Sequence, residues 1–83
     1  MSAAEKLVQG LGGPENIEDL ESCIVRIRAI ISDPLQVDEA VIRETNPIAV
    51  VSSGRYVQII VGPASDDLVE EMQQVLEGAK VHP

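Results

Sequence analysis

Cys23 is the only cysteine of this 83-residue chain, and two arginines, Arg26 and Arg28, follow it closely. No acidic residue occurs between Ser22 and Ser32, although the whole chain has 6 basic and 14 acidic residues and a net charge of −8. The sequence therefore predicts a locally positive field at Cys23, which favours the thiolate, the nucleophilic form of this side chain. Guanidinium groups also bind phosphoryl oxygens in pairs, so the two arginines are expected to stabilise a dianionic group on the sulfur.

The backbone next to Cys23 is expected to contribute as well. The N–H groups of Ile24, Val25 and Arg26 are predicted to point at the same phosphoryl oxygens. Each charge-assisted hydrogen bond contributes about 1.5–3 kcal/mol, so several together would hold a reactive phosphoryl group. An alternative stays open, because a single cysteine in a small domain is more often a buried small hydrophobe. Two arginines on an exposed strand face are, in the same way, more often only solvated.

The composition excludes several other classes of function. One cysteine cannot form an internal disulfide, and His82, the one histidine, leaves no His/Cys cluster for a metal site. The acidic balance has the wrong sign for a nucleic-acid binder, and Tyr56 is the only aromatic residue. No apolar run approaches the roughly 20 residues that span a bilayer, and no signal peptide opens the chain. These features predict a soluble, cytoplasmic domain that uses no metal.

Hydrophobic periodicity and turn residues predict the element order αββαββα. The predicted helices are 3–11, 38–44 and a last one that begins at Ser65, Asp66 or Asp67; the predicted strands are 16–20, 24–31, 48–52 and 56–61. A polar corner at Glu21 and Ser22 is expected to separate the first two strands.

Alternation in the second predicted strand separates two sets of side chains. The set facing the core is Val25, Ile27, Ala29 and Ile31, and the arginines lie on the other face. Because strands joined by short turns pair antiparallel, we expect a four-stranded antiparallel sheet with three helices on one face, a two-layer α+β sandwich. Residues 1–83 are expected to form one domain, with a core from 3 to 77 and a frayed tail at 78–83.

The stretch 21–28 has the sequence ESCIVRIR, which resembles the phosphorylation-site motif of the IIB domains of the bacterial phosphoenolpyruvate-dependent sugar phosphotransferase system. The subfamily is the glucose/N-acetylglucosamine type, in which the motif is Cys-Ile-Thr-Arg-Leu-Arg. The similarity covers roughly residues 5–76 and includes LGG at 11–13, ENI at 15–17, VDEA at 37–40 and VQIIVG at 57–62.

The resemblance implies a stand-alone IIB component, an enzyme that is both a protein-cysteine phosphocarrier and a sugar phosphotransferase. Phosphohistidine of a IIA protein gives its phosphoryl group to Cys23, which forms a covalent S-phosphocysteine without a cofactor. Cys23 then transfers it to a sugar of the glucose or N-acetylglucosamine type, bound in the membrane IIC transporter. The expected location is the cytoplasm, at the inner face of the membrane through IIC, and the expected state is a monomer.

Further residues receive roles from the same resemblance. Arg26 and Arg28 match the two arginines of the motif and would hold the phosphocysteine. Gln58 matches a glutamine near the IIA contact. The turn at 52–56 departs from the family pattern, and its Arg55 would add positive charge if the turn folded towards the site; the alternative is a solvated turn residue.

One departure from the motif leaves other functions open. Val25 stands where the family has threonine, so a hydroxyl that could bind phosphate is missing. This change favours an alternative, a non-catalytic IIB-like regulatory module that docks IIA or a transcriptional partner. A third possibility is a plain α+β interaction domain with a structural cysteine.

Overall fold

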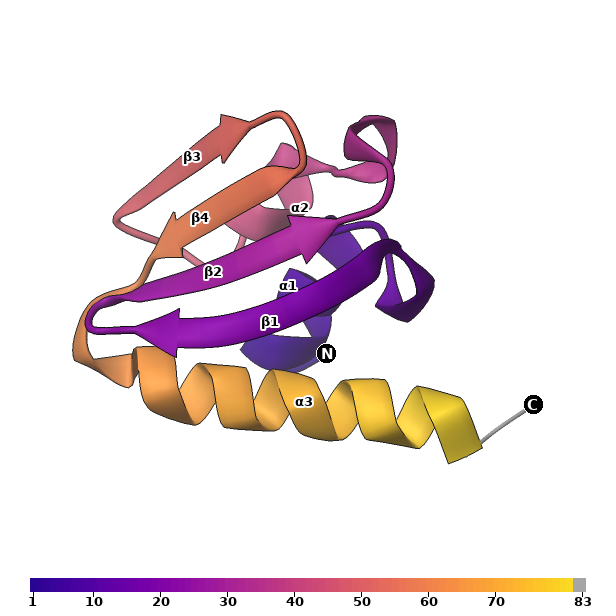
Figure 1. Ribbon diagram of the computed structural model, residues 1–83. Helices are drawn as coiled ribbons and strands as arrows, with labels where there is room; N and C mark the ends of the chain where they lie inside the picture. The colour runs from indigo at the N-terminus through magenta and orange to yellow at the C-terminus, as the bar shows by residue number, and fades with distance from the viewer. Residues whose placement is uncertain (82–83) are drawn as a thin grey trace.

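The computed structural model describes residues 1–81 and confirms the element order αββαββα (Figure 1). The helices are α1 (Ala3–Gly10), α2 (Glu39–Arg43) and α3 (Ser65–Val81), and the strands are β1 (Ile17–Cys23), β2 (Arg26–Ile31), β3 (Ala49–Ser53) and β4 (Tyr56–Ile60). Short 3-10 turns at Pro14–Asn16, Pro34–Gln36 and Gly62–Ala64 lie between them.

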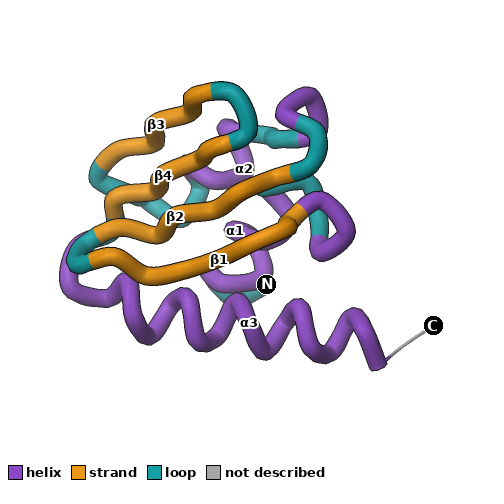
Figure 2. The backbone as a smooth tube through the Cα atoms, in the orientation of Figure 1, coloured by secondary structure: helices purple, strands orange, loops and turns teal. Residues whose placement is uncertain are grey.

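The four strands form one antiparallel sheet in the spatial order β1-β2-β4-β3. Two hairpins, β1–β2 and β3–β4, therefore meet through their second strands. The helices lie on one side of the sheet, with α3 running along β1, and the other side is uncovered (Figures 1 and 2). This arrangement confirms the predicted two-layer α+β sandwich. We call the uncovered side of the sheet the open face.

The core fills the space between the sheet and the helices. The alternation predicted for β2 is confirmed at Ile27, Ala29 and Ile31, which are almost completely buried. Aliphatic side chains from the other elements meet them there: Leu7, Leu11, Ile42, Val57, Ile59 and Met72. Each side chain of this size contributes about 1.5–3 kcal/mol to the stability of the fold when it is fully removed from water. A small aliphatic core can therefore hold the sheet and the helices together.

Local signals set the starts of two helices. Ser2 and Glu5 form a reciprocal capping box at α1, in which each side chain accepts the backbone N–H of the other. The Asp38 carboxylate accepts the backbone N–H groups of Ala40 and Val41, so the predicted helix cap at this residue is confirmed.

The corner between the first two strands was predicted wrongly. Glu21 and Ser22 continue β1, which runs to Cys23, and the chain reverses at Ile24 and Val25 instead. Val25, predicted to face the core, lies in this turn and is 37% exposed. The prediction failed because polar residues on a sheet edge resemble a turn, whereas two β-branched residues rarely form one.

The end of the chain also differs from the prediction. The frayed tail was expected from Gly78, but α3 continues to Val81. Lys80, in the last turn, suits the negative end of the helix dipole and lies 3.8 Å from the Glu77 carboxylate. The remaining tail residues, including His82, lie outside the described residues.

One buried polar side chain joins three segments that are distant in sequence. Asn16 is 3% exposed, and its Nδ2 donates to the carbonyls of Leu11 (2.7 Å) and Asp33 (3.1 Å). Its Oδ1 accepts the Asp33 backbone N–H at 2.8 Å. The amide thus ties the end of α1 to the loop after β2.

We expect Asn16→Ala to lower the free energy of unfolding by about 2–3 kcal/mol, because backbone groups of Leu11 and Asp33 lose their partner. Urea denaturation measures this change. The control, Gln9→Ala on the exposed side of α1, should change the free energy by less than about 0.5 kcal/mol. Equal effects of the two substitutions would contradict the role of Asn16.

Candidate functional site

The β1–β2 hairpin brings Cys23 and both arginines to the open face. In the register of the hairpin, Cys23 lies opposite Arg26, and Glu21 lies opposite Arg28. On the next strand, Gln58 lies opposite Arg28. Directly opposed residues share a face of the sheet, and so do residues two apart along a strand. Cys23, a free and partly exposed cysteine, therefore shares this face with every side chain that the sequence assigned to the site except Arg55.

The two arginines have different partners. Arg26 Nη1 donates to Gln58 Oε1 at 2.9 Å, and Arg28 Nη1 lies 3.5 Å from Glu21 Oε1. The positive field predicted around Cys23 is thus partly offset by Glu21, which the hairpin places beside Arg28. The Glu21–Arg28 pair is exposed, and such pairs contribute only about 0–1 kcal/mol, so a more highly charged anion can replace the carboxylate.

The turn after Cys23 holds an unusual backbone conformation. Ile24 has a φ of 60°, in the left-handed region, and its side chain is 85% exposed. Positive φ at the first turn residue alone is typical of a type II′ hairpin turn, where glycine is the usual residue. For a β-branched residue this conformation costs about 1–3 kcal/mol and persists only when its surroundings enforce it.

Hydrogen bonds from the start of α3 and from the segment before it enforce this turn. The Ile24 carbonyl accepts the Ser65 hydroxyl at 2.6 Å. The Val25 carbonyl accepts two backbone N–H groups, those of Val61 and Gly62, each at 3.0 Å. Both carbonyls of the turn are therefore fixed by residues that follow β4.

These bonds also fix the direction of the backbone N–H groups. Ser65 opens α3, in the helical layer, so the Ile24 carbonyl points towards that layer. A trans peptide places its N–H opposite its C=O, and the Val25 N–H consequently points towards the open face. The next carbonyl, that of Val25, points along the sheet towards the end of β4, which directs the Arg26 N–H towards β1. Of the three N–H groups named from the sequence, the geometry turns that of Val25 to the face that carries Cys23.

The Ser65 contact was missed in the sequence, where Ser65 was considered only as a helix cap. Ser65 is completely buried, and its Oγ lies 3.1 Å from the hydroxyl of Ser22 on β1. The Ser22 hydroxyl also contacts the Asp66 carboxylate. No local sequence signal indicates this cluster, because Ser22 lies more than 40 positions before Ser65 and Asp66.

Exposed apolar side chains lie next to the turn. Ile24 and Val25 are at its tip, and Ile48, which is 73% exposed, lies over Gly62. Gly62 in turn donates to the Val25 carbonyl. We call Ile24, Val25 and Ile48 the apolar rim. Apolar surface beside charged groups is typical of a protein-docking surface.

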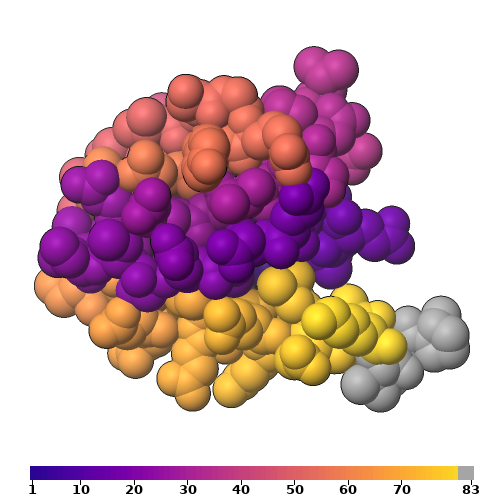
Figure 3. Space-filling view, in the orientation of Figure 1, coloured from indigo at the N-terminus to yellow at the C-terminus, as the bar shows by residue number. Residues whose placement is uncertain are grey.

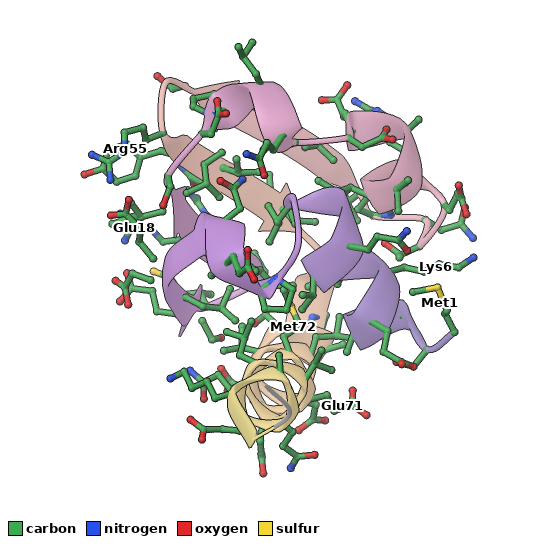
Figure 4. All side chains as sticks on the ribbon, turned by 90° about the vertical axis from the view of Figure 1, so that its right-hand side faces the viewer. Met1, Lys6, Glu18, Arg55, Glu71 and Met72 are labelled. Carbon is green, nitrogen blue, oxygen red and sulfur yellow. The ribbon has the colours of Figure 1, made fainter. Side chains whose placement is uncertain are left out.

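Arg55 lies at the other end of the sheet from Cys23. Its Nε donates to the Ile31 carbonyl at 3.0 Å, and its Nη2 lies 2.5 Å from Glu18 Oε1 (Figure 4). Ile31 ends β2, whereas the cysteine is opposite the first residue of that strand. The β3–β4 turn therefore does not bring this arginine to the site.

A groove of about 1030 Å³ lies remote from Cys23, between the start of β1 and the second half of α3. In Figure 3, the surface of α3 adjoins that of β1 along the lower part of the molecule. The charged lining of the groove is mostly acidic: Glu15, Glu18, Asp19, Glu70, Glu77 and Lys80. A carboxylate-rich groove repels phosphate, so the groove is not an alternative phosphoryl site.

Within residues 1–81, no group of His, Cys, Asp or Glu could hold a metal ion. None of the helices described is both long and apolar enough to cross a membrane.

Comparison with known proteins gives consistent similarities. The family model described as phosphotransferase system, EIIB, matches residues 5–38. The chain is 37% identical over 75 residues to the N-acetylglucosamine-specific EIIB component of the PTS system of Streptomyces coelicolor, covering 90% of this chain and 97% of that protein. It is 33% identical over 78 residues to the glucose-specific EIICBA component of Staphylococcus carnosus, covering 94% of this chain and 12% of that protein.

A solved structure shows the same fold. It is one domain of the PTS system IIabc component from Clostridium difficile, with a TM-score of 0.70 and 21% sequence identity. The match covers 92% of this chain and 77% of that one.

Because the Glu18 carboxylate contacts Arg55, we expect part of the free energy of unfolding to be lost at acidic pH. The hydrogen bond from Ser32, followed by that from Arg55, lowers the pKa of the Glu18 carboxyl below its usual 4.5. The contribution of this carboxylate is therefore complete above pH 4.5 and is lost as the pH falls through the lower pKa of the folded state.

We expect Glu18→Gln to be less stable than the wild type at neutral pH and the difference to shrink on acidification below pH 4.5. Urea denaturation across this pH range measures it, with Glu71→Gln, on the exposed side of α3, as control. A difference that stays constant with pH would show that ionised Glu18 does not stabilise the fold.

Proposed function

Because the chain belongs to the EIIB family of the phosphotransferase system, we propose that it accepts a phosphoryl group on Cys23 and transfers it to a sugar of the glucose or N-acetylglucosamine type. The observation that carries this proposal is the position of Cys23. It is partly exposed at the end of β1, directly opposite Arg26 and on the same face as Arg28. A cysteine that only packed the core would not occupy such a position.

In the first transfer, the Cys23 thiolate attacks the phosphorus of a phosphohistidine on the IIA protein. An S–P bond forms and the P–N bond breaks. The leaving imidazole keeps the electron pair of the broken bond and is neutral when its other ring nitrogen carries a proton. The thiol proton has gone to solvent beforehand, and no metal or cofactor takes part.

The arginines change partners when the phosphoryl group arrives. Arg28 leaves Glu21 and binds the dianion, because a charge-assisted bond to phosphate is worth about 1.5–3 kcal/mol and the exposed pair only about 0–1 kcal/mol. Gln58 holds Arg26 over the sheet until the transfer. The Val25 N–H, directed to the open face, adds a donor that needs no particular side chain at this position.

This backbone donor bears on the regulatory alternative. That alternative depended on Val25 in place of the threonine of the family motif. Valine lacks the threonine hydroxyl but keeps the backbone N–H group. The bond between Ser65 and the Ile24 carbonyl sets the direction of this N–H group. The geometry therefore favours a phosphocarrier over a module that has lost the chemistry.

In the second transfer, a sugar hydroxyl attacks the phosphorus and the S–P bond breaks. Cys23 leaves as a thiolate with the electron pair, and the hydroxyl proton passes to a base outside this chain. Arg26 and Arg28 stabilise the negative charge that develops during this step.

Two partners fit the surface around Cys23. The apolar rim and the adjacent arginines suit a IIA protein and, in turn, the IIC transporter that holds the sugar. The name of one relative, the EIICBA component, supports this assignment by joining the three parts. We infer that the protein works as a monomer at the cytoplasmic face of the membrane.

Cys23→Ala is expected to abolish phosphorylation by phosphorylated IIA, whereas the wild type should gain one phosphoryl group in intact-mass spectrometry. The control is Arg55→Ala, which removes a cation at the far end of the sheet and should be labelled at the wild-type rate. Equal labelling of Cys23→Ala and the wild type would refute the assignment of the acceptor.

Arg28→Ala should slow transfer to the sugar by about 100-fold and acceptance from IIA by much less, because the dianion needs stabilisation as it leaves. Rapid-quench measurements of the two half-reactions, with phosphorylated IIA and with membranes containing IIC, separate the steps. Slow acceptance combined with a normal rate to the sugar would contradict this division.

A further inference from the structure

A buried hydroxyl on α3 controls the turn that follows Cys23. Ser65 donates to the Ile24 carbonyl at 2.6 Å, from a position that solvent does not reach. We propose that Ser65 is a positioning residue for phosphoryl transfer, because this bond directs the Val25 N–H to the phosphoryl group on Cys23. The inference rests on the acceptor role proposed above and adds a residue outside the cysteine–arginine motif.

The turn needs an external restraint. Rotation of the peptide between Ile24 and Val25 changes the ψ of Ile24 and the φ of Val25, and would convert the type II′ turn to type I′, the other common two-residue hairpin turn. The same rotation would turn the Val25 N–H away from the open face. The Ser65 bond opposes it by holding the Ile24 carbonyl on the helical side of the sheet.

The Ser65 hydroxyl serves the turn and not the helix. Helix capping uses a serine oxygen as an acceptor, because the first turn of a helix offers only N–H donors. Here the proton of the hydroxyl goes to a carbonyl that lies 41 positions earlier in the chain. Its neighbour Ser22 contacts Ser65 and Asp66 but does not reach the turn carbonyl, which makes Ser22→Ala a matched control.

The first experiment follows transfer and the backbone together. We expect Ser65→Ala to slow acceptance from phosphorylated IIA by about 10- to 100-fold, the value of one charge-assisted hydrogen bond. In NMR spectra, phosphorylation should move the Val25 amide proton downfield in the wild type and in Ser22→Ala, and much less in Ser65→Ala. A wild-type rate and a wild-type shift in Ser65→Ala would overturn the inference.

The second experiment is independent of phosphorylation. Residual dipolar couplings of the unmodified protein report the direction of the Val25 N–H bond. We expect the wild-type direction in Ser22→Ala and a different one in Ser65→Ala. An unchanged direction in Ser65→Ala would refute the positioning role even if no phosphoryl group ever reached Cys23. Failure of wild-type labelling, in contrast, would refute the acceptor role alone.

A rescue variant separates positioning from simple destabilisation. Glycine adopts a φ of 60° without strain, so Ile24→Gly lets the turn keep its conformation without the Ser65 bond. The double variant Ser65→Ala/Ile24→Gly should recover most of the transfer rate and the Val25 amide shift. If the double variant transfers no faster than Ser65→Ala, Ser65 acts through something other than the turn.

Discussion

The register of the β1–β2 hairpin is the constraint on which the rest of the molecule depends. Pairing of Cys23 with Arg26 places the Cys23 sulfur and both arginines on one side of the sheet and Leu20 and Ile27 on the other. A slip of one residue would exchange these sides and bury a guanidinium among aliphatic side chains. The same hydrogen-bond ladder thus determines the hydrophobic core and the chemistry of the open face.

The two-residue turn that sets this register is not stable by its own sequence. Ile24 occupies a glycine-like conformation, and the turn depends on α3 and on the segment before it for its hydrogen bonds. Around it, the charged side chains are held only by exposed contacts, Arg26 with Gln58 and Arg28 with Glu21. A rigid backbone with exchangeable side-chain partners suits the phosphoryl transfer proposed for Cys23.

Much of the fold could be predicted from local signals, since alternation in β2 and the cap at Asp38 depend on neighbouring residues only. Cys23, the candidate nucleophile, and its two arginines could also be named from the sequence, because they are close neighbours in the chain. Three features depend on pairing across the sheet or between layers: the turn at Ile24, the position of Glu21 beside Arg28, and the Ser65 bond. A linear pattern carries no information on such contacts, and the resemblance to a known motif identified residue types without their partners.

The orientation of α3 has a consequence for how this domain can be tethered. The helix starts beneath the turn next to Cys23 and runs along β1 to the opposite end of the molecule (Figure 1). Its 17 residues span about 25 Å. A polypeptide joined after this helix would therefore leave the domain far from the sulfur, and a linker there could vary in length and composition without obstructing the approach of a docking protein.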